Sequence, residues 1–167
     1  TGFIQNDLTE VLQFIFDCFH NSICREVDMV VSGKAQTQTD VLAEKCYNMM
    51  KNMYKKEYSE FLNMFYGIHV SIVESKESDY KNTVPEPFFN IMLPISDSND
   101  LIKCFDLFTK KEDLGEDNKV LNDKNNSKEE ATKQILFWNL PNILVITLKR
   151  FGNNGRKDKT FIDFPIN

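Results

Sequence analysis

Apolar residues near the N-terminus recur at intervals of three and four, which is the period of one face of an α-helix. This stripe consists of Leu8, Val11, Leu12, Ile15, Phe16, Phe19 and Ile23. It predicts a helix within 5–27, with Asp7 as its N-cap and Glu10 completing a capping box three residues later. On this interpretation the two carboxylates simply begin the helix.

A second apolar stripe follows a polar loop that begins after Val30. Its spacing predicts a helix that ends near Lys56 and is capped by Thr39 or Asp40. The apolar positions are Val41, Leu42, Cys46, Met49, Met50 and Met53. A methionine-rich face can bind partners promiscuously, but core packing is its commoner use, and we assign it to the core. A shorter helix then ends at Gly67, before an alternating strand.

The C-terminal part of the chain favours strands. Ile143 to Leu148 is aliphatic almost without a break, which is typical of a strand covered on both faces. Pro141 marks the start of this strand because proline cannot donate to a ladder of backbone hydrogen bonds. The turn signal at 152–155 then predicts that 159–165 returns as the partner strand.

The middle of the chain supplies the remaining elements. The stretch 85–95, bounded by prolines, predicts one strand, and the Ser and Asp residues of 96–99 would cap a short helix over 101–107. A polar insert over 115–130 indicates a solvated turn or finger tip. The whole pattern predicts one α+β domain over 1–167, with helices over 1–67 and a mainly antiparallel sheet over 68–167.

Composition narrows the function classes. The chain has a formal net charge of −5 and a pI of about 5.1, which argues against a nucleic-acid surface. No apolar run approaches the ~20 residues of a membrane span, and no signal peptide opens the chain. We therefore expect no membrane association and an intracellular location, in the cytoplasm or nucleus. Because the chain begins with Thr1 and not with Met, we expect a fragment of a longer protein.

Cysteine and histidine are the residues to test for nucleophilic catalysis. The four cysteines, Cys18, Cys24, Cys46 and Cys104, lie in predicted helices without C-x-x-C spacing, which favours free thiols in a reducing compartment. Cys18 and His20 are two apart on a helix and face different sides. His69 has no cysteine near it in sequence, although the fold could bring one. We assign no catalytic residue, no metal ligand and no cofactor.

Several segments resemble one known family in the right order. The stretch from Leu140-Pro141 to Leu148-Lys149-Arg150-Phe151 is similar to a central palm strand of the ubiquitin-specific proteases, which are papain-like cysteine deubiquitinases. Gln5-Asn6-Asp7-Leu8-Thr9-Glu10-Val11-Leu12 resembles their Gln-Gln-Asp-x-x-Glu-Phe-Leu box, and Asp17-Cys18-Phe19-His20 their Asp-x-Leu-His. The helix over 101–114 and Phe65-x-Gly67 also match family segments. The resemblance therefore covers the chain essentially end to end.

The resemblance implies a palm-and-fingers fold and a role in removing ubiquitin from conjugates. It implies that Asp7 and Glu10 bind the basic C-terminal tail of ubiquitin, since a carboxylate pair one helical turn apart suits arginine. Ubiquitin or ubiquitinated proteins would be the partners. The family's catalytic Cys and His lie outside the matched motifs, so this chain alone is not expected to cleave a substrate.

Departures from the family pattern leave alternatives open. The family commonly places Cys-x-x-Cys pairs in two finger segments, where this chain has 73–76 and 121–124 without cysteine, so the usual zinc finger is not expected. Leu8 and Val11 also depart from the box. The chain could thus belong to a catalytically inactive ubiquitin-binding or scaffold module with the same fold. An unrelated α+β domain would explain the periodicities but not the ordered set of motifs.

Overall fold

The structure is a computed structural model that describes residues 8–97, 99–152 and 155–165. Its packing divides the chain into two compact units. The first contains the described residues up to Ile68 together with 86–90 and 139–145, and the second contains the others. No helix among the described residues is long and apolar enough to cross a membrane. The single domain expected over 1–167 stays a prediction.

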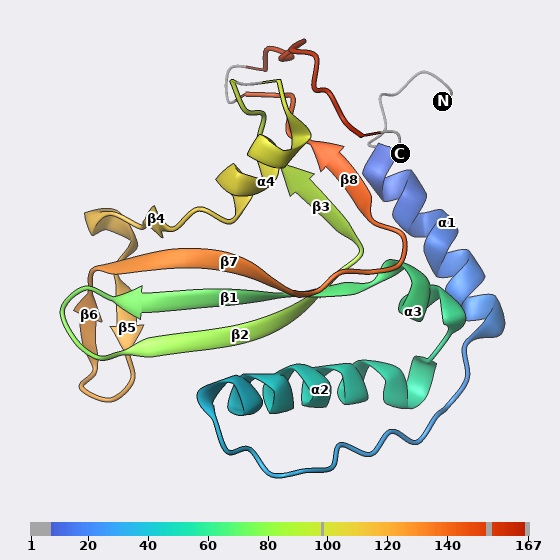
Figure 1. The fold of residues 1–167 in the computed structure, drawn as a ribbon, viewed down its shortest axis with the longest axis horizontal. Helices are drawn as coiled ribbons and strands as arrows, with labels where there is room; N and C mark the ends of the chain where they lie inside the picture. The colour runs from blue at the N-terminus through green and yellow to red at the C-terminus, as the bar shows by residue number, and fades with distance from the viewer. Residues whose placement is uncertain (1–7, 98, 153–154, 166–167) are drawn as a thin grey trace. The chain divides into compact units, whose positions relative to one another are not determined.

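Three helices form most of the first unit: α1 (Leu8–Ile23), α2 (Gln38–Glu57) and α3 (Glu60–Phe65). Figure 1 shows α3 lying against the C-terminal half of α1. The predicted cap of α2 at Thr39 or Asp40 was wrong, because Thr37 caps the helix. Its side chain accepts from the Asp40 backbone N–H at 3.2 Å, and the Asp40 carboxylate accepts from the Thr37 N–H at 2.8 Å. Asp40 is therefore the N3 partner of a capping box.

Aromatic rings hold α1 and α3 together. The ring of Phe16 lies 4.4 Å from that of Phe65 and 4.3 Å from that of Phe89, measured between centroids. Phe61 adds an edge contact to Phe16 at 5.8 Å. Phe16 therefore packs against α3 and Phe89, but five other members of the apolar stripe are exposed, and no residue of α1 is fully buried; the exposed members are Leu8, Val11, Ile15, Phe19 and Ile23.

Gly67 begins β1 (Gly67–Ser75) at a point of close approach. A Cβ added there would lie 2.7 Å from the Asn139 carbonyl oxygen and 2.8 Å from Cε1 of Phe88. The backbone of Gly67 is not in the left-handed region. The glycine is therefore needed for space, and not for the helix-ending conformation that the sequence had indicated.

A four-stranded sheet has the order β2-β1-β7-β4, with β2 (Lys81–Phe88), β7 (Ala131–Asn139) and β4 (Glu112–Asp113). The short strand β4 pairs antiparallel with β7, so Glu112 lies opposite Lys133. The strand β2 lies at the other edge. It contains Pro85 and Pro87, and an edge is where a strand tolerates residues without an N–H group.

Two strand predictions were wrong in their partners and bounds. The single strand predicted over 85–95 breaks at Phe89 into β2 and a separate β3 (Asn90–Leu93). The strand β8 (Val145–Leu148) pairs with β3, not with 159–165, and the described residues of that segment form no strand. The residues of β8 are half-buried, so the strand is not covered on both faces as predicted.

The second unit also holds α4 (Leu101–Phe108), η1 (Glu116–Asn118) and an antiparallel hairpin of β5 (Val120–Asn122) and β6 (Ser127–Glu129). The hairpin lies at the end of the sheet where β1 turns into β2 (Figure 1). Asp100, and not 96–99, caps α4, because its Oδ1 accepts from the Ile102 backbone N–H at 2.8 Å. The polar insert predicted over 115–130 contains η1, β5 and β6, so it is a structured finger tip.

Candidate functional site

The structure describes one of the two carboxylates predicted to bind ubiquitin. Glu10 lies in the first turn of α1, and its side chain is exposed. Asp7 lies outside the described residues, as does the capping box that the two were predicted to form. The binding role of Asp7 and Glu10 therefore stays a prediction, and Glu10 is placed where another molecule can reach it.

A polar stripe runs along α1 from Glu10. Glu10, Gln13, Asp17 and His20 follow at intervals of three, four and three, so they share one side of the helix. Gln13 Nε2 donates to Asp17 Oδ1 at 2.9 Å. The same amide lies 3.5 Å from the Tyr66 hydroxyl, which links the stripe to the end of α3.

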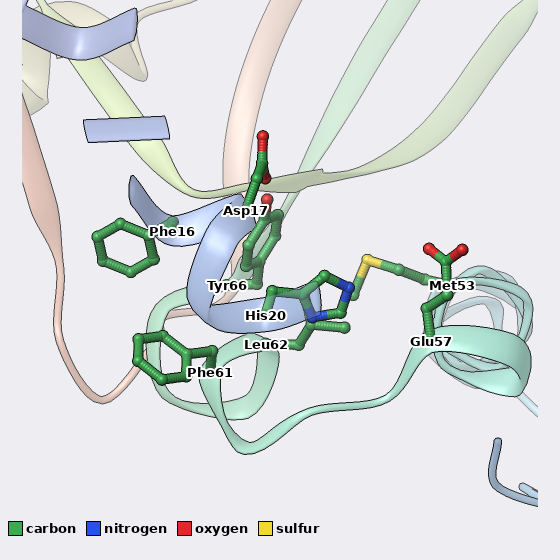
Figure 2. Close-up of a pocket in the computed structure, with 8 residues that line it drawn as sticks. All are labelled: Phe16, Asp17, His20, Met53, Glu57, Phe61, Leu62 and Tyr66. Atoms are coloured by element: carbon green, nitrogen blue, oxygen red, sulfur yellow. The ribbon is translucent and has the colours of Figure 1, made fainter. Parts of the chain in front are cut away.

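The stripe ends at a cavity of about 230 Å³ within the first unit. Its lining comes from α1, the last turns of α2, and α3 with the residue that follows it. The residues are Phe16, Asp17, His20, Met53, Glu57, Phe61, Leu62 and Tyr66. Figure 2 shows His20 pointing toward Met53 and Glu57, with Phe61 and Leu62 beneath it. The cavity thus combines an apolar base with two carboxylates.

The His20 side chain is fixed by the start of α3. Its Nδ1 lies 2.8 Å from Ser59 Oγ. Ser59 is the N-cap of α3, and its oxygen already accepts from the Leu62 backbone N–H at 3.3 Å. Which of the two groups donates depends on the tautomer of the His20 ring. Asp17 and His20 stand three apart on α1, and both line the cavity.

A serine–histidine hydrogen bond is also found in the active sites of many hydrolases. Ser59 does not fit that role, because its side chain is fully buried and its oxygen is used as a helix cap. The cavity lining instead includes two carboxylates, Asp17 and Glu57, together with the apolar side chains of Phe61 and Leu62.

The cysteines do not complete a nucleophilic centre. Cys46 and Cys104 are fully buried, and burial raises the pKa of the Cys46 thiol, which disfavours the thiolate. Cys18 is exposed, but it lies two residues from His20 on α1 and faces another side of the helix. Among the described residues, Cys18, Cys46 and Cys104 therefore supply no thiolate paired with His20.

The structure is an α+β fold in which the first unit carries an acidic helix face on α1 and the second unit carries a structured finger tip. The comparison with known families is more specific. The model of the ubiquitin carboxyl-terminal hydrolase family matches residues 1–167, and the chain belongs to this family. The resemblance expected from the sequence motifs is thereby confirmed.

Relatives and a solved structure agree with this assignment. Ubiquitin carboxyl-terminal hydrolase 2 of Gallus gallus is 31% identical over 175 residues, covering 99% of this chain and 48% of the relative. Ubiquitin carboxyl-terminal hydrolase 21 of Mus musculus is 26% identical and matched over 34% of its length. The chain therefore spans about half or less of these relatives.

The structural match is to the SAGA Ubp8/Sgf11/Sus1/Sgf73 DUB module bound to ubiquitin aldehyde. The TM-score is 0.66 at 29% sequence identity, and the match covers 98% of this chain and 32% of the other. The predicted fold class, helices followed by a mainly antiparallel sheet resembling palm and fingers, is confirmed.

Sequence motifs had indicated part of the cavity but not all of it. Asp17 and His20 stood out in the Asp-x-Leu-His match. Glu57, Ser59 and Tyr66 gave no signal, because they reach the cavity only through the packing of α2 and α3 against α1. The available hint was Ser59, a residue type that commonly caps helices and that follows the apolar stripe of α2.

Proposed function

We propose that this chain is the palm-and-fingers portion of a cysteine-type deubiquitinase that removes ubiquitin from protein conjugates. The observation that carries the proposal is the match to the ubiquitin carboxyl-terminal hydrolase family over 1–167. The solved relative bound to ubiquitin aldehyde supports ubiquitin as the ligand. The four free cysteines support an intracellular location, in the cytoplasm or nucleus.

The contribution of this chain is to hold the substrate. Ubiquitin's basic C-terminal tail would lie along the polar side of α1, where Asp7 and Glu10 accept hydrogen bonds from its cationic side chains. Charge-assisted bonds of this kind are stronger than neutral ones. In the whole enzyme a thiolate would attack the isopeptide carbonyl and expel the protonated lysine amine of the conjugate, which forms a thioester acyl-enzyme. Water would then hydrolyse the thioester, releasing the ubiquitin carboxylate and restoring the thiol. Neither carboxylate performs chemistry in this scheme.

Binding is tested by titrating isotope-labelled ubiquitin with this chain and recording NMR spectra. We expect shifts concentrated in the basic tail of ubiquitin. Asp7→Ala/Glu10→Ala should weaken binding by ~100-fold or more, because each of the two charge-assisted hydrogen bonds contributes ~1.5 kcal/mol or more. Glu44→Ala, an exposed acidic position on α2, is the matched control and should bind as tightly as the unaltered chain.

If the double variant and the Glu44 control lose the same binding affinity, the loss comes from the change in net charge. That result would contradict the roles assigned to Asp7 and Glu10. Activity is a separate question, tested on the full-length protein with a ubiquitin probe that traps a reactive thiol. Labelling of the full-length protein by this probe would support the proposal that it is an active deubiquitinase. Tail binding without labelling would favour the inactive ubiquitin-binding module, for which the departures at Leu8 and Val11 are the supporting observation.

A further inference from the structure

The finger tip of the second unit is built around a buried carboxylate. Glu129 at the end of β6 is 3% exposed, and Asn122 at the end of β5 is equally buried. Both belong to a segment whose composition had indicated only a solvated turn. A buried charge is costly unless it is paired or fully hydrogen-bonded, so its partners decide whether it belongs there.

Two separate hairpins supply those partners. From the β5–β6 hairpin, Asn122 Nδ2 and Asn125 Nδ2 donate to Glu129 Oε1 at 2.9 and 2.8 Å. From the turn between β1 and β2, Ser78 Oγ donates to Oε2 at 2.5 Å, and Ser75 also hydrogen-bonds the carboxylate. One side chain thereby joins the two hairpins.

The two serines of the β1–β2 segment each have a hydroxyl hydrogen to present to Glu129. Ser75 Oγ accepts from the backbone N–H groups of Glu77 and Ser78, at 2.9 and 3.1 Å, so its own proton is left for Glu129. Ser78 Oγ accepts from the Tyr80 N–H at 3.2 Å and likewise donates to the carboxylate. Each of these groups presents a hydrogen, so the site accommodates the ionised carboxylate and not the acid.

The electrostatic consequence agrees with this geometry. Hydrogen bonds from Ser75, Ser78, Asn125 and Asn122 hold the pKa of the Glu129 carboxyl well below its usual range. The adjoining backbone is also joined across the hairpins, because the Lys76 N–H donates to the Glu130 carbonyl at 2.8 Å. The tip is therefore a closed network of side-chain and backbone hydrogen bonds.

The family's usual device in these finger segments is a pair of Cys-x-x-Cys sequences that bind zinc. The residues present here do not fit a metal. The two converging pairs, Ser75 with Ser78 and Asn122 with Asn125, carry hydroxyls and amides whose hydrogens point at a carboxylate. Soft thiolates are absent from both pairs, and no group of three or more metal-ligating side chains gathers among the described residues.

We propose that the Glu129 carboxylate is the structural centre of the finger tip and holds the β1–β2 turn to the β5–β6 hairpin without a metal ion. The centre of the tip is thus the Glu129 anion surrounded by hydrogen-bond donors, where a zinc finger has a metal cation surrounded by its ligands. The proposal concerns the architecture of the tip and holds whether or not the chain binds ubiquitin.

The test is amide hydrogen exchange of Glu129→Gln, which keeps the side-chain shape but turns two hydrogens toward the donors. We expect exchange within 75–80 and 120–130 to accelerate by ~10-fold or more, while amides of α2 stay unchanged. Glu130→Gln is the matched control. It removes the same charge one residue away, where the partly exposed carboxylate lies 3.7 Å from Lys76 Nζ and 3.9 Å from Lys119 Nζ.

Two further measurements separate the alternatives. Ser78→Ala removes one donor and should produce a smaller acceleration in the same two segments. Metal analysis of the purified chain and exchange in the presence of a chelator should show no stoichiometric zinc and no change at the tip. Unchanged protection in Glu129→Gln, equal effects of both glutamine variants, or a chelator-sensitive tip would each overturn the proposal.

Discussion

Gly67→Ala is the substitution for which the structure gives the sharpest expectation. The new methyl group would meet two obstacles: the Asn139 carbonyl oxygen at 2.7 Å and the Phe88 ring at 2.8 Å. Carbon atoms in proteins normally approach no closer than ~3.5 Å. A flexible side chain could move aside, but the carbonyl belongs to the backbone at the end of β7, and Phe88 is buried.

The magnitude follows from these two contacts. Overpacking a well-filled site costs ~1–3 kcal/mol, and a backbone obstacle places Gly67→Ala at the upper end. Replacing glycine by alanine also restricts the unfolded chain, which offsets the loss by ~0.4–1 kcal/mol. We therefore expect the free energy of unfolding to fall by about 2 kcal/mol. With a urea m-value of ~1–3 kcal/mol/M, the unfolding midpoint drops by about 1 M.

Urea unfolding followed by circular dichroism measures this shift. Gly115→Ala is the control for backbone strain alone, because its φ is +71° and no atom lies within 4 Å of the added Cβ. The Phe88→Ala background is the control for the clash, since removing the ring should reduce the additional cost of Gly67→Ala. An unchanged midpoint would refute the steric explanation, whereas the same cost with and without the Phe88 ring would assign the clash to the Asn139 carbonyl alone.

Two other expectations follow from contacts described above. Phe16→Ala should lower the free energy of unfolding by about 3 kcal/mol, because it removes the ring that contacts Phe65 and Phe89. Phe14 is exposed, so Phe14→Ala should cost little stability in the same denaturation experiment. Equal losses in the two variants would contradict the packing described for Phe16. Hydrogen bonds from Lys111 and Lys81 lower the pKa of Glu74 from 4.5 to about 2, so its stabilising contribution is present above pH 4.5 and is lost as the pH falls toward 2. Lys111→Met should raise this pKa toward 4.5 in a carbon-13 NMR titration of the carboxyl group, whereas an equal rise in Lys110→Met would contradict the pairing.

Helices were the part of the fold that the sequence predicted well, and the reason is local. The stripe of α1 and the stripe of α2 repeat with the helical period over several turns, so no distant residue is needed to recognise them. The caps were less certain. Thr37, Thr39 and Asp40 are all competent cap residues, and only the extended backbone at Thr37 decides between them.

Strand pairing required knowledge of the tertiary structure. The turn signal at 152–155 favoured a hairpin, but β8 pairs with β3, which lies more than fifty residues earlier in the chain. Such non-local partners leave no local pattern. The same holds for the tip, where Glu129 looks like a solvated charge until Ser78 from another hairpin is brought beside it.

Residues of the candidate site could be predicted from the sequence only where they belong to a motif that resembles the family. Glu10, Asp17 and His20 carried a signal, since they belong to segments that resemble a family. The His20–Ser59 bond and the carboxylate of Glu57 depend on how α2 and α3 end, which a one-dimensional pattern does not specify.

The prolines of β2 have a consequence for the behaviour of the protein in solution. An edge strand with a full row of free N–H groups is a template on which a second chain can add, and such addition leads to aggregates. Pro85 and Pro87 remove two of those donors from the exposed edge of the four-stranded sheet. The edge therefore resists growth by strand addition, and replacing both prolines by valine would turn a terminated sheet into one that another copy could extend.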